Sequence, residues 1–171
     1  MPPRKHDRKA NGAARARNGA AKSSRVMRPF SRSLPMQLMR AREAVMRRFR
    51  PHLAAHGLSE QQWRIVRALI EAENLEIGEL AEECRIHPAS LSRMLPNLAR
   101  AGLISRKSRK DDQRRVVISI TPRGRALFRS VAPESEDIYA AMEREIGARK
   151  LRDLYRLLDE LIATLPGREN R

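Results

Sequence analysis

The stretch that decides the fold is residues 77–121, IGELAEECRIHPASLSRMLPNLARAGLISRKSRKDDQRRVVISIT. It opens with apolar residues at Ile77, Leu80, Ala81 and Cys84, which are spaced i, i+3, i+4 and i+7. This spacing places all four on one face of a helix. The pattern predicts a short helix of about two turns.

A tight turn at residues 85–87 leads from this helix into a second one. Pro88 suits the first position of the second helix, because the N–H that proline lacks has no partner there anyway. Leucines at helical spacing mark the buried face: Leu91, Leu95 and Leu98. Gly102 suits the left-handed residue that ends a helix. Two helices joined by about three residues, the second amphipathic, form a helix-turn-helix.

Two short strands follow, at residues 103–108 and 115–121, around a polar loop at 109–114. Val116, Ile118 and Ile120 alternate with Val117 and Ser119, which is the period of a strand. A β-hairpin placed directly after the second helix is a wing. The sequence therefore predicts a mainly α fold with a small β-hairpin wing, a winged helix-turn-helix.

Helices are also expected on the N-terminal side. Apolar periodicity indicates one helix over residues 34–55, with Gly57 as its stop. Another begins after Ser59 and runs to about residue 74, because Ser59 and Gln62 occupy the positions of a capping box. The two positions of a hydrophobic staple hold Leu58 and Trp63.

Two more helices are expected after the hairpin. Thr121 and Pro122 suit the start of a helix that runs to about Ile146, and the last helix follows over residues 151–165. Interior prolines remove a backbone hydrogen bond, so kinks are predicted at Pro133 and between Ser92 and Pro96.

The charge points to a polyanionic partner. The chain has 36 Lys+Arg and 20 Asp+Glu, a formal net charge of +16, and a pI of about 11.4. Residues 1–32 hold ten basic residues and one acidic residue, a net of +9, which leaves 26 − 19 = +7 for residues 33–171. With few large apolar side chains, residues 1–32 are predicted to be a disordered basic arm. The arm either adds phosphate contacts or is a solvated extension.

Several classes of protein are excluded. No apolar run approaches the ~18 residues of a membrane span, and no apolar run follows the basic N-terminus as in a secretory signal. With Cys84 as the single cysteine, no intramolecular disulfide forms, which fits the cytoplasm. There is no glycine-rich phosphate loop or nucleophile elbow, so no enzyme activity and no cofactor are expected.

Two smaller features leave alternatives open. Cys84 is either a packed core thiol or a redox switch. His52 and His56 lie four residues apart, as two metal ligands on a helix do, but no acidic or cysteine partner is near them in sequence, so no metal site is predicted.

Residues 34–165 resemble the MarR family of bacterial regulators. The residues that carry the resemblance are Leu80-Ala81, Ala101-Gly102-Leu103-Ile104, Asp112-Gln113-Arg114-Arg115 and Ile118-Ser119-Ile120-Thr121-Pro122-Arg123-Gly124. Three further segments are similar to the subgroup that controls homoprotocatechuate (hydroxyphenylacetate) catabolism: Ala41-Arg42-Glu43-Ala44, Phe49-Arg50-Pro51 and residues 56–64, HGLSEQQWR.

The resemblance implies a homodimer whose first and last helices interlock, with two winged lobes on pseudo-palindromic DNA. It also implies repression of a nearby catabolic operon, relieved by a small aromatic acid. The corresponding domains are a basic arm (1–32), a dimerisation helix (33–57), a DNA-binding lobe (58–122), C-terminal dimerisation helices (123–166) and a tail (167–171). Such a regulator is expected in the cytoplasm, on the nucleoid when DNA-bound.

The expected DNA contacts follow from the motif, because the first turns of the second helix meet base edges in the major groove. Those positions are Pro88, Ala89, Ser90, Ser92 and Arg93. Arg93 either reads guanine or contacts a phosphate. In the wing, Arg114 is expected in the minor groove, and Asp112 is expected to orient Arg114 or Arg115. Backbone contacts are expected from Arg106, Lys107, Arg109 and Lys110.

An effector site is expected between the dimerisation helices and the DNA-binding lobe, as the resemblance implies. A carboxylate ligand needs a guanidinium, and an aromatic ring needs an apolar wall. The candidates are Arg42, Met46, His56, Trp63 and Arg64. As the alternative, Trp63 is a core residue, and Arg42 and Arg64 pair with Glu43 or Glu60. A ligand-independent architectural DNA-binding protein is the alternative function.

Overall fold

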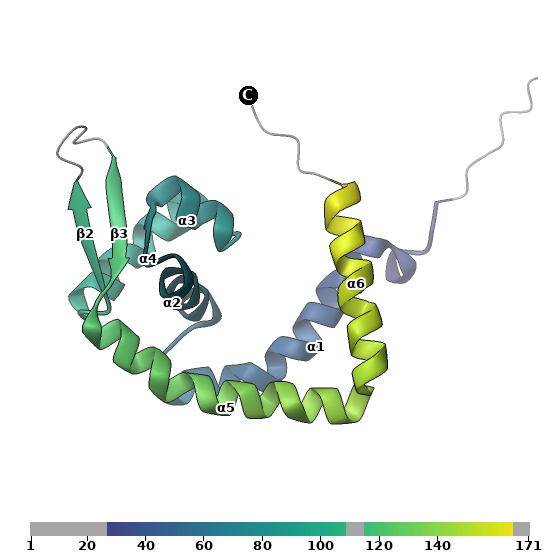
Figure 1. Ribbon diagram of the computed structural model, residues 1–171. Coiled ribbons are helices and arrows are strands. Elements are labelled where there is room, and N and C mark those ends of the chain that lie inside the picture. Colours follow the sequence, from purple (N-terminus) through teal and green to yellow (C-terminus); the bar gives the residue numbers. More distant parts are fainter. Residues whose placement is uncertain (1–26, 109–114, 166–171) are drawn as a thin grey trace, which may run out of the picture. The chain divides into compact units, whose positions relative to one another are not determined.

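A computed structural model describes residues 27–108 and 115–165 (Figure 1). The chain divides into two compact units, Met1–Gln37 and Leu38–Arg171. In the first, Phe30–Arg32 forms a 3-10 turn, η1, closed by the Arg32 N–H, which donates to the Pro29 carbonyl at 2.8 Å. Local hydrogen bonding therefore orders the last residues of the stretch for which disorder was predicted. Residues 1–26 of that arm lie outside the described residues.

Helices make up most of the second unit. Helix α1 (Leu34–Ala55) begins in the first unit and continues into the second. The helices that follow are α2 (Glu60–Ala72), α3 (Ile77–Glu83), α4 (Pro88–Arg100), α5 (Pro122–Ile146) and α6 (Ala148–Thr164). Figure 1 shows α5 as a long curved helix between the strands and α6. The predicted mainly α fold is confirmed, and the helix bounds lie close to those expected.

The sheet has three antiparallel strands in the order β1–β3–β2. Strands β2 (Ile104–Ser108) and β3 (Val116–Ile120) are the predicted hairpin, with Ile104 opposite Ile120. Strand β1 (Asn74–Glu76) was not predicted, and α2 ends at Ala72, slightly before the expected end near residue 74. Glu73 has a φ of 62° and ends α2, so the next three residues pair with β3.

Local capping accounts for where these helices begin. The Gln62 N–H donates to Ser59 Oγ at 3.2 Å, and the Ser59 N–H donates to Gln62 Oε1 at 2.8 Å. Thr121 Oγ1 likewise accepts from the Gly124 N–H at 3.0 Å. The predicted capping box and the predicted start of α5 are both confirmed.

One hydrophobic core joins the lobe to α1 and α5. Its fully buried members include Leu53, Ile65, Leu69, Leu80, Leu91, Leu95, Leu98, Ile118 and Val131. Cys84 belongs to the same cluster, with 3% of its surface exposed. Burial raises the pKa of its thiol to about 11, which favours the packed core thiol over the redox switch.

His52 also lies in the interior and connects α1 to α5. Its Nε2 lies 3.0 Å from the Val131 carbonyl oxygen, and its Nδ1 lies 2.8 Å from a Glu134 carboxylate oxygen. Within residues 27–108 and 115–165, no three His, Cys, Asp or Glu side chains gather as a metal site would require. Over the same residues, no helix combines the length and apolarity that crossing a membrane demands.

Candidate nucleic-acid interface

Helices α3 and α4 form the predicted helix-turn-helix. The Ile86 N–H donates to the Ala81 carbonyl at 2.9 Å, and the Arg85 N–H donates to the Glu82 carbonyl at 3.0 Å. These two bonds are the Schellman pattern that closes a helix. The turn is also held from α2, where Arg64 Nη1 donates to the Cys84 carbonyl at 2.6 Å.

Helix α4 presents its predicted DNA-contacting residues to solvent. His87 caps the helix, with its Nδ1 accepting from the Ala89 N–H at 3.3 Å, and Pro88 occupies the first turn. The opposite face is anchored by the three buried leucines. The exposed residues of the first turns are Pro88, Ala89, Ser90, Ser92 and Arg93. Within the described chain, the Arg93 guanidinium has no carboxylate at ion-pair distance, so its donors are available to a ligand.

Pro96 lies inside α4, which is helical without a break from Pro88 to Arg100. Arg100 donates to the side-chain oxygen of Asn97 on the exposed side of the last turn. The expected kink between Ser92 and Pro96 stays a prediction, because an unbroken helix still permits a bend.

The wing places Arg106 and Lys107 on exposed positions of β2. The other predicted contacts of the hairpin loop lie outside the described residues: Arg109, Lys110, Asp112 and Arg114. Arg115 lies at the base of β3 and binds a carboxylate of the lobe. Its Nη2 lies 2.7 Å from one oxygen of Glu76, and its Nε lies 3.0 Å from the other.

Glu76 was not singled out from the sequence. Its side chain caps α3 by accepting from the backbone of Glu79, and Glu79 Oε2 accepts from the Glu76 N–H at 2.8 Å. Glu79 stands three residues after Glu76, as in a capping box, but Glu76 replaces the Ser or Thr that marks such a cap in a sequence. Through Glu76, Arg115 connects the wing to the first helix of the motif.

The predicted effector residues fall into separate surroundings. Trp63 is buried and stacks on Phe128, with ring centroids 5.6 Å apart. Arg42 binds the Glu60 carboxylate, and Met46 packs half-buried against the core. His56 lines a cavity between the α1–α2 loop and α5, and Arg64 binds the turn of the helix-turn-helix as described above.

Arg67 is a further arginine of α2 that was not singled out from the sequence. Arg67 follows Trp63 by one helical turn and is exposed, and its Nη1 lies 3.5 Å from the Tyr139 hydroxyl. Its nearest carboxylate among the described residues is Glu71, at 3.8 Å. The sequence indicates this position only by the i, i+4 spacing from Trp63.

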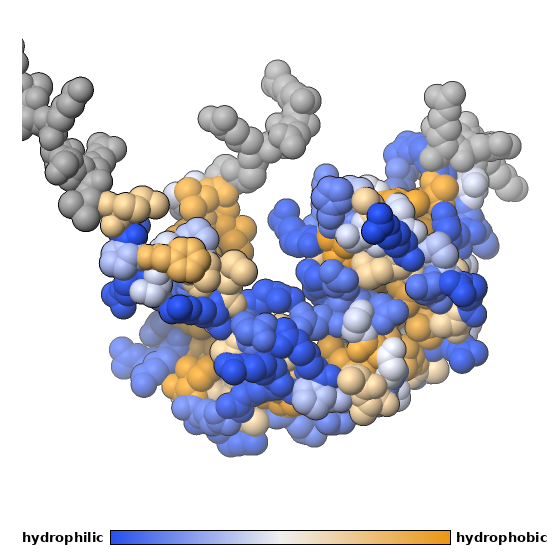
Figure 2. Space-filling view, turned by 180° about the vertical axis from the view of Figure 1, so that it is seen from behind, coloured by the Kyte–Doolittle hydropathy of each residue, from blue (hydrophilic) through white to orange (hydrophobic). Residues whose placement is uncertain are grey.

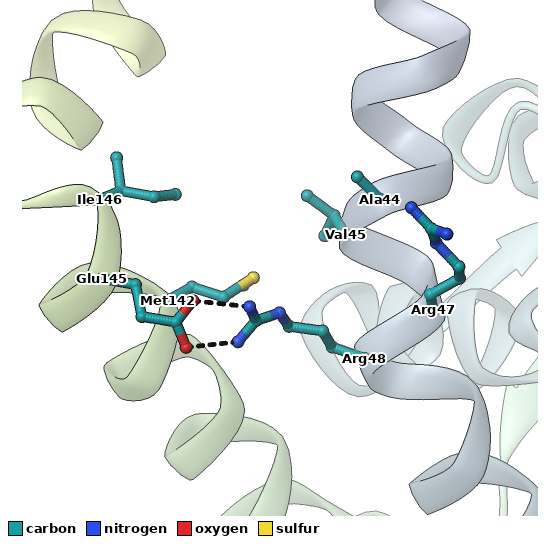
Figure 3. A pocket seen from close by; sticks show the side chains of 7 residues that line it. All are labelled: Ala44, Val45, Arg47, Arg48, Met142, Glu145 and Ile146. Atoms are coloured by element: carbon teal, nitrogen blue, oxygen red, sulfur yellow. Dashed lines mark hydrogen bonds and ion pairs between the residues drawn. The ribbon is translucent and has the colours of Figure 1, made fainter.

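A second opening lies between α1 and α5 (Figure 3). Arg48 crosses it and donates to both oxygens of Glu145, at 2.7 and 2.6 Å, which lowers the pKa of that carboxyl. Val45 and Ile146 lie on either side, and 38% and 40% of their surfaces are exposed. These two side chains give the opening an apolar rim.

Comparison with known proteins decides the family. A profile described as "MarR family" matches residues 58–116. Over 131 residues the chain is 40% identical to the homoprotocatechuate degradative operon repressor of Escherichia coli, covering 77% of this chain and 88% of the relative. The chain belongs to the MarR family. It is accordingly a DNA-binding transcriptional regulator and not an enzyme.

Two further proteins are similar to this chain, one in sequence and one in structure. The transcriptional regulator FarR of Neisseria gonorrhoeae is 39% identical over 129 residues, 75% of this chain and 88% of FarR. The crystal structure of NadR in complex with 4-hydroxyphenylacetate superposes with a TM-score of 0.68 at 37% identity, covering 80% of this chain and 96% of that one. The helix-turn-helix and wing described above are therefore the DNA-binding lobe of a MarR protein.

Proposed function

We propose that this regulator represses a catabolic operon by binding a pseudo-palindromic operator as a homodimer, and that a small aromatic carboxylate releases it. The observation that carries the proposal is the exposed N-terminal face of α4, where Arg93 has no carboxylate partner among the described residues, in a chain 40% identical to an operon repressor. A repressor of this kind acts in the cytoplasm, and it lies on the nucleoid when it is bound to DNA.

The homodimer is supported by apolar side chains that a single chain leaves uncovered. None of the residues of α6 is buried, although the helix carries a leucine stripe. Leu154, Leu157 and Ile162 expose 45%, 53% and 65% of their surfaces. Figure 2 shows hydrophobic side chains at several places on the face seen from behind. A second copy that covers this stripe removes apolar area from water, at roughly 25 cal/mol per Å².

On the operator, α4 enters the major groove of each half-site. Arg93 binds guanine in bidentate fashion, and Pro88, Ala89, Ser90 and Ser92 approach bases and phosphates. Arg114 enters the adjacent minor groove, and Asp112 orients Arg114 or Arg115. Four basic residues of the wing bind the DNA backbone: Arg106, Lys107, Arg109 and Lys110. Arg115, whose guanidinium is paired with Glu76, supports the base of the wing beside the DNA.

The effector binds along α2. Trp63 supplies an aromatic wall, and Arg64 and Arg67 supply donors for a carboxylate. Arg64 Nε supports this assignment, because it is buried and forms no hydrogen bond with a described residue. The known complex of NadR with 4-hydroxyphenylacetate supports the ligand class. Three other predicted residues lie around this site: Arg42 is paired with Glu60, Met46 packs against the core, and His56 lines a cavity beside α5.

Fluorescence anisotropy tests the function directly. The protein is titrated onto DNA from upstream of its own gene and onto scrambled DNA at fixed salt, and then with 4-hydroxyphenylacetate and homoprotocatechuate. Specific binding that one compound reverses is the expected result. Equal binding to both DNAs that no compound affects would instead indicate the architectural protein.

Arg93→Ala separates base reading from phosphate binding. We expect a loss of about 1–3 kcal/mol of operator binding, with discrimination relaxed at one base pair per half-site. Arg129→Ala, an exposed arginine on α5, is the matched control and should bind as the parent does. A uniform loss on all sequences would assign Arg93 to a phosphate contact.

A further inference from the structure

A cavity of about 440 Å³ lies between the α1–α2 loop, the end of α4 and α5. Its lining residues are His56, Gly57, Leu58, Ala101, Leu103, Arg123, Ala126, Leu127 and Ser130. The size falls in the range of roughly 300–1,000 Å³ that small-molecule sites occupy. Neither Trp63 nor Arg67 lines it, so it is distinct from the effector site proposed above.

The lining combines a cation with an apolar wall. The stem of Arg123 passes over Gly102, where an added Cβ would lie 3.5 Å from Arg123 Cδ. No carboxylate of the described chain lies at ion-pair distance from Arg123, and none of the nine lining residues is acidic. Leu58 and Leu103 are buried and, with Leu127, form the apolar side.

Two further polar groups lie in the same lining. His56 Nδ1 lies 3.1 Å from the His52 carbonyl oxygen, which makes Nδ1 the protonated nitrogen and leaves Nε2 for a ligand. Ser130 Oγ donates to the Leu127 carbonyl at 2.8 Å and can still accept. Ala126 and Ser130 are small, which keeps the face of α5 between them and Arg123 open.

We propose that this cavity binds a small monocarboxylate with an apolar body, its carboxylate on Arg123 and its body against Leu58, Leu103 and Leu127. A guanidinium binds a carboxylate in bidentate fashion, and the three leucines remove an apolar ring or chain from water. The bound molecule contacts Ala101 and Leu103, which directly follow α4, and it contacts the loop that precedes α2. Binding of a ligand in this cavity therefore acts on the end of α4, the helix proposed to enter the major groove.

The test uses the full chain with carbon-13 at histidine Cε1 and sodium benzoate as the probe. The chain has four histidines, and His56→Gln assigns the signal of interest. Benzoate should shift the His56 signal and saturate it, while neutral benzamide should bind more weakly. Arg123→Gln should weaken benzoate binding by about tenfold, the effect of removing a charge-assisted hydrogen bond. Ala126→Leu, which fills the cavity, should abolish the shift.

Two controls make the result decisive. Arg129→Gln changes an exposed arginine of the same helix that does not line the cavity, and it should respond as the parent does. Arg67→Gln should lose effector release from DNA and keep the His56 response, which separates this proposal from the effector site. An unshifted His56 signal, an unchanged affinity in Arg123→Gln, or a response lost in Arg67→Gln would overturn the proposal.

Discussion

At the scale of single residues, three helices end at a residue in the left-handed conformation, and one of these residues is not glycine. The residues that end α1, α3 and α4 are Gly57, Arg85 and Gly102, with φ values of 70°, 49° and 70°. All three positions close a Schellman motif, in which the left-handed conformation strains any residue with a Cβ. Arg85 is the member of this set that carries such strain.

Arg85→Gly should therefore raise the free energy of unfolding by up to about 1 kcal/mol, because glycine adopts this conformation without a steric cost. The measurement is urea denaturation at one fixed protein concentration. Gly102→Ala, the reverse change at an equivalent position, should destabilise the protein by a similar amount. A lower stability of Arg85→Gly would mean that its side chain contributes more than its backbone costs.

Cys84 should be a poor nucleophile in the native protein. Burial raises the pKa of its thiol from 9.0 to about 11, so at pH 8 the reactive thiolate is about a hundredfold scarcer than in a free thiol. Iodoacetamide should label the thiol slowly until denaturant is added. Because the folded-state pKa is the higher one, this group stabilises the fold below pH 9 and loses that contribution between pH 9 and 11. Rapid native labelling at pH 8 would contradict this.

At the scale of elements, the attachment of α5 to α1 depends on His52. The side chain is buried, its Nε2 lies 3.0 Å from the Val131 carbonyl oxygen, and its Nδ1 lies 2.8 Å from the Glu134 carboxylate without forming a hydrogen bond with a described residue. His52→Ala should lower the free energy of unfolding by about 2–4 kcal/mol, because it leaves a cavity and unpaired polar groups. Glu134→Ala should cost less, since 60% of that side chain is exposed. Equal stability of His52→Ala and the parent in urea would show that His52 does not hold α5 to α1.

At the scale of the whole molecule, the proposed homodimer holds two lobes on the operator through the apolar side chains that α6 exposes. Leu154→Glu places a carboxylate in the middle of the α6 stripe, where burial of an unpaired charge costs several kcal/mol. Sedimentation velocity should show dissociation into single chains, and operator affinity should fall with it. Asp159→Lys, a charge change on the polar side of α6, should remain dimeric. A dimeric Leu154→Glu variant would place the interface elsewhere.

The sequence by itself determined the features that depend on neighbours within a few residues. Ser59 with Gln62, Pro88, Gly102 and Thr121 set where helices begin and end, because capping bonds span three or four positions. Period and spacing also predicted the helix-turn-helix, the hairpin and the exposed face of α4.

The tertiary structure decided the pairings between distant positions. Strand β1 has three residues, too few for a period, and exists because β3 offers it hydrogen bonds. Arg115 with Glu76 and His52 with Glu134 lie far apart in the chain, and the partner of Arg64 is a backbone carbonyl that no side-chain pattern marks. Such contacts depend on how helices and strands pack, and packing brings together residues that local hydrogen bonding and periodicity do not relate.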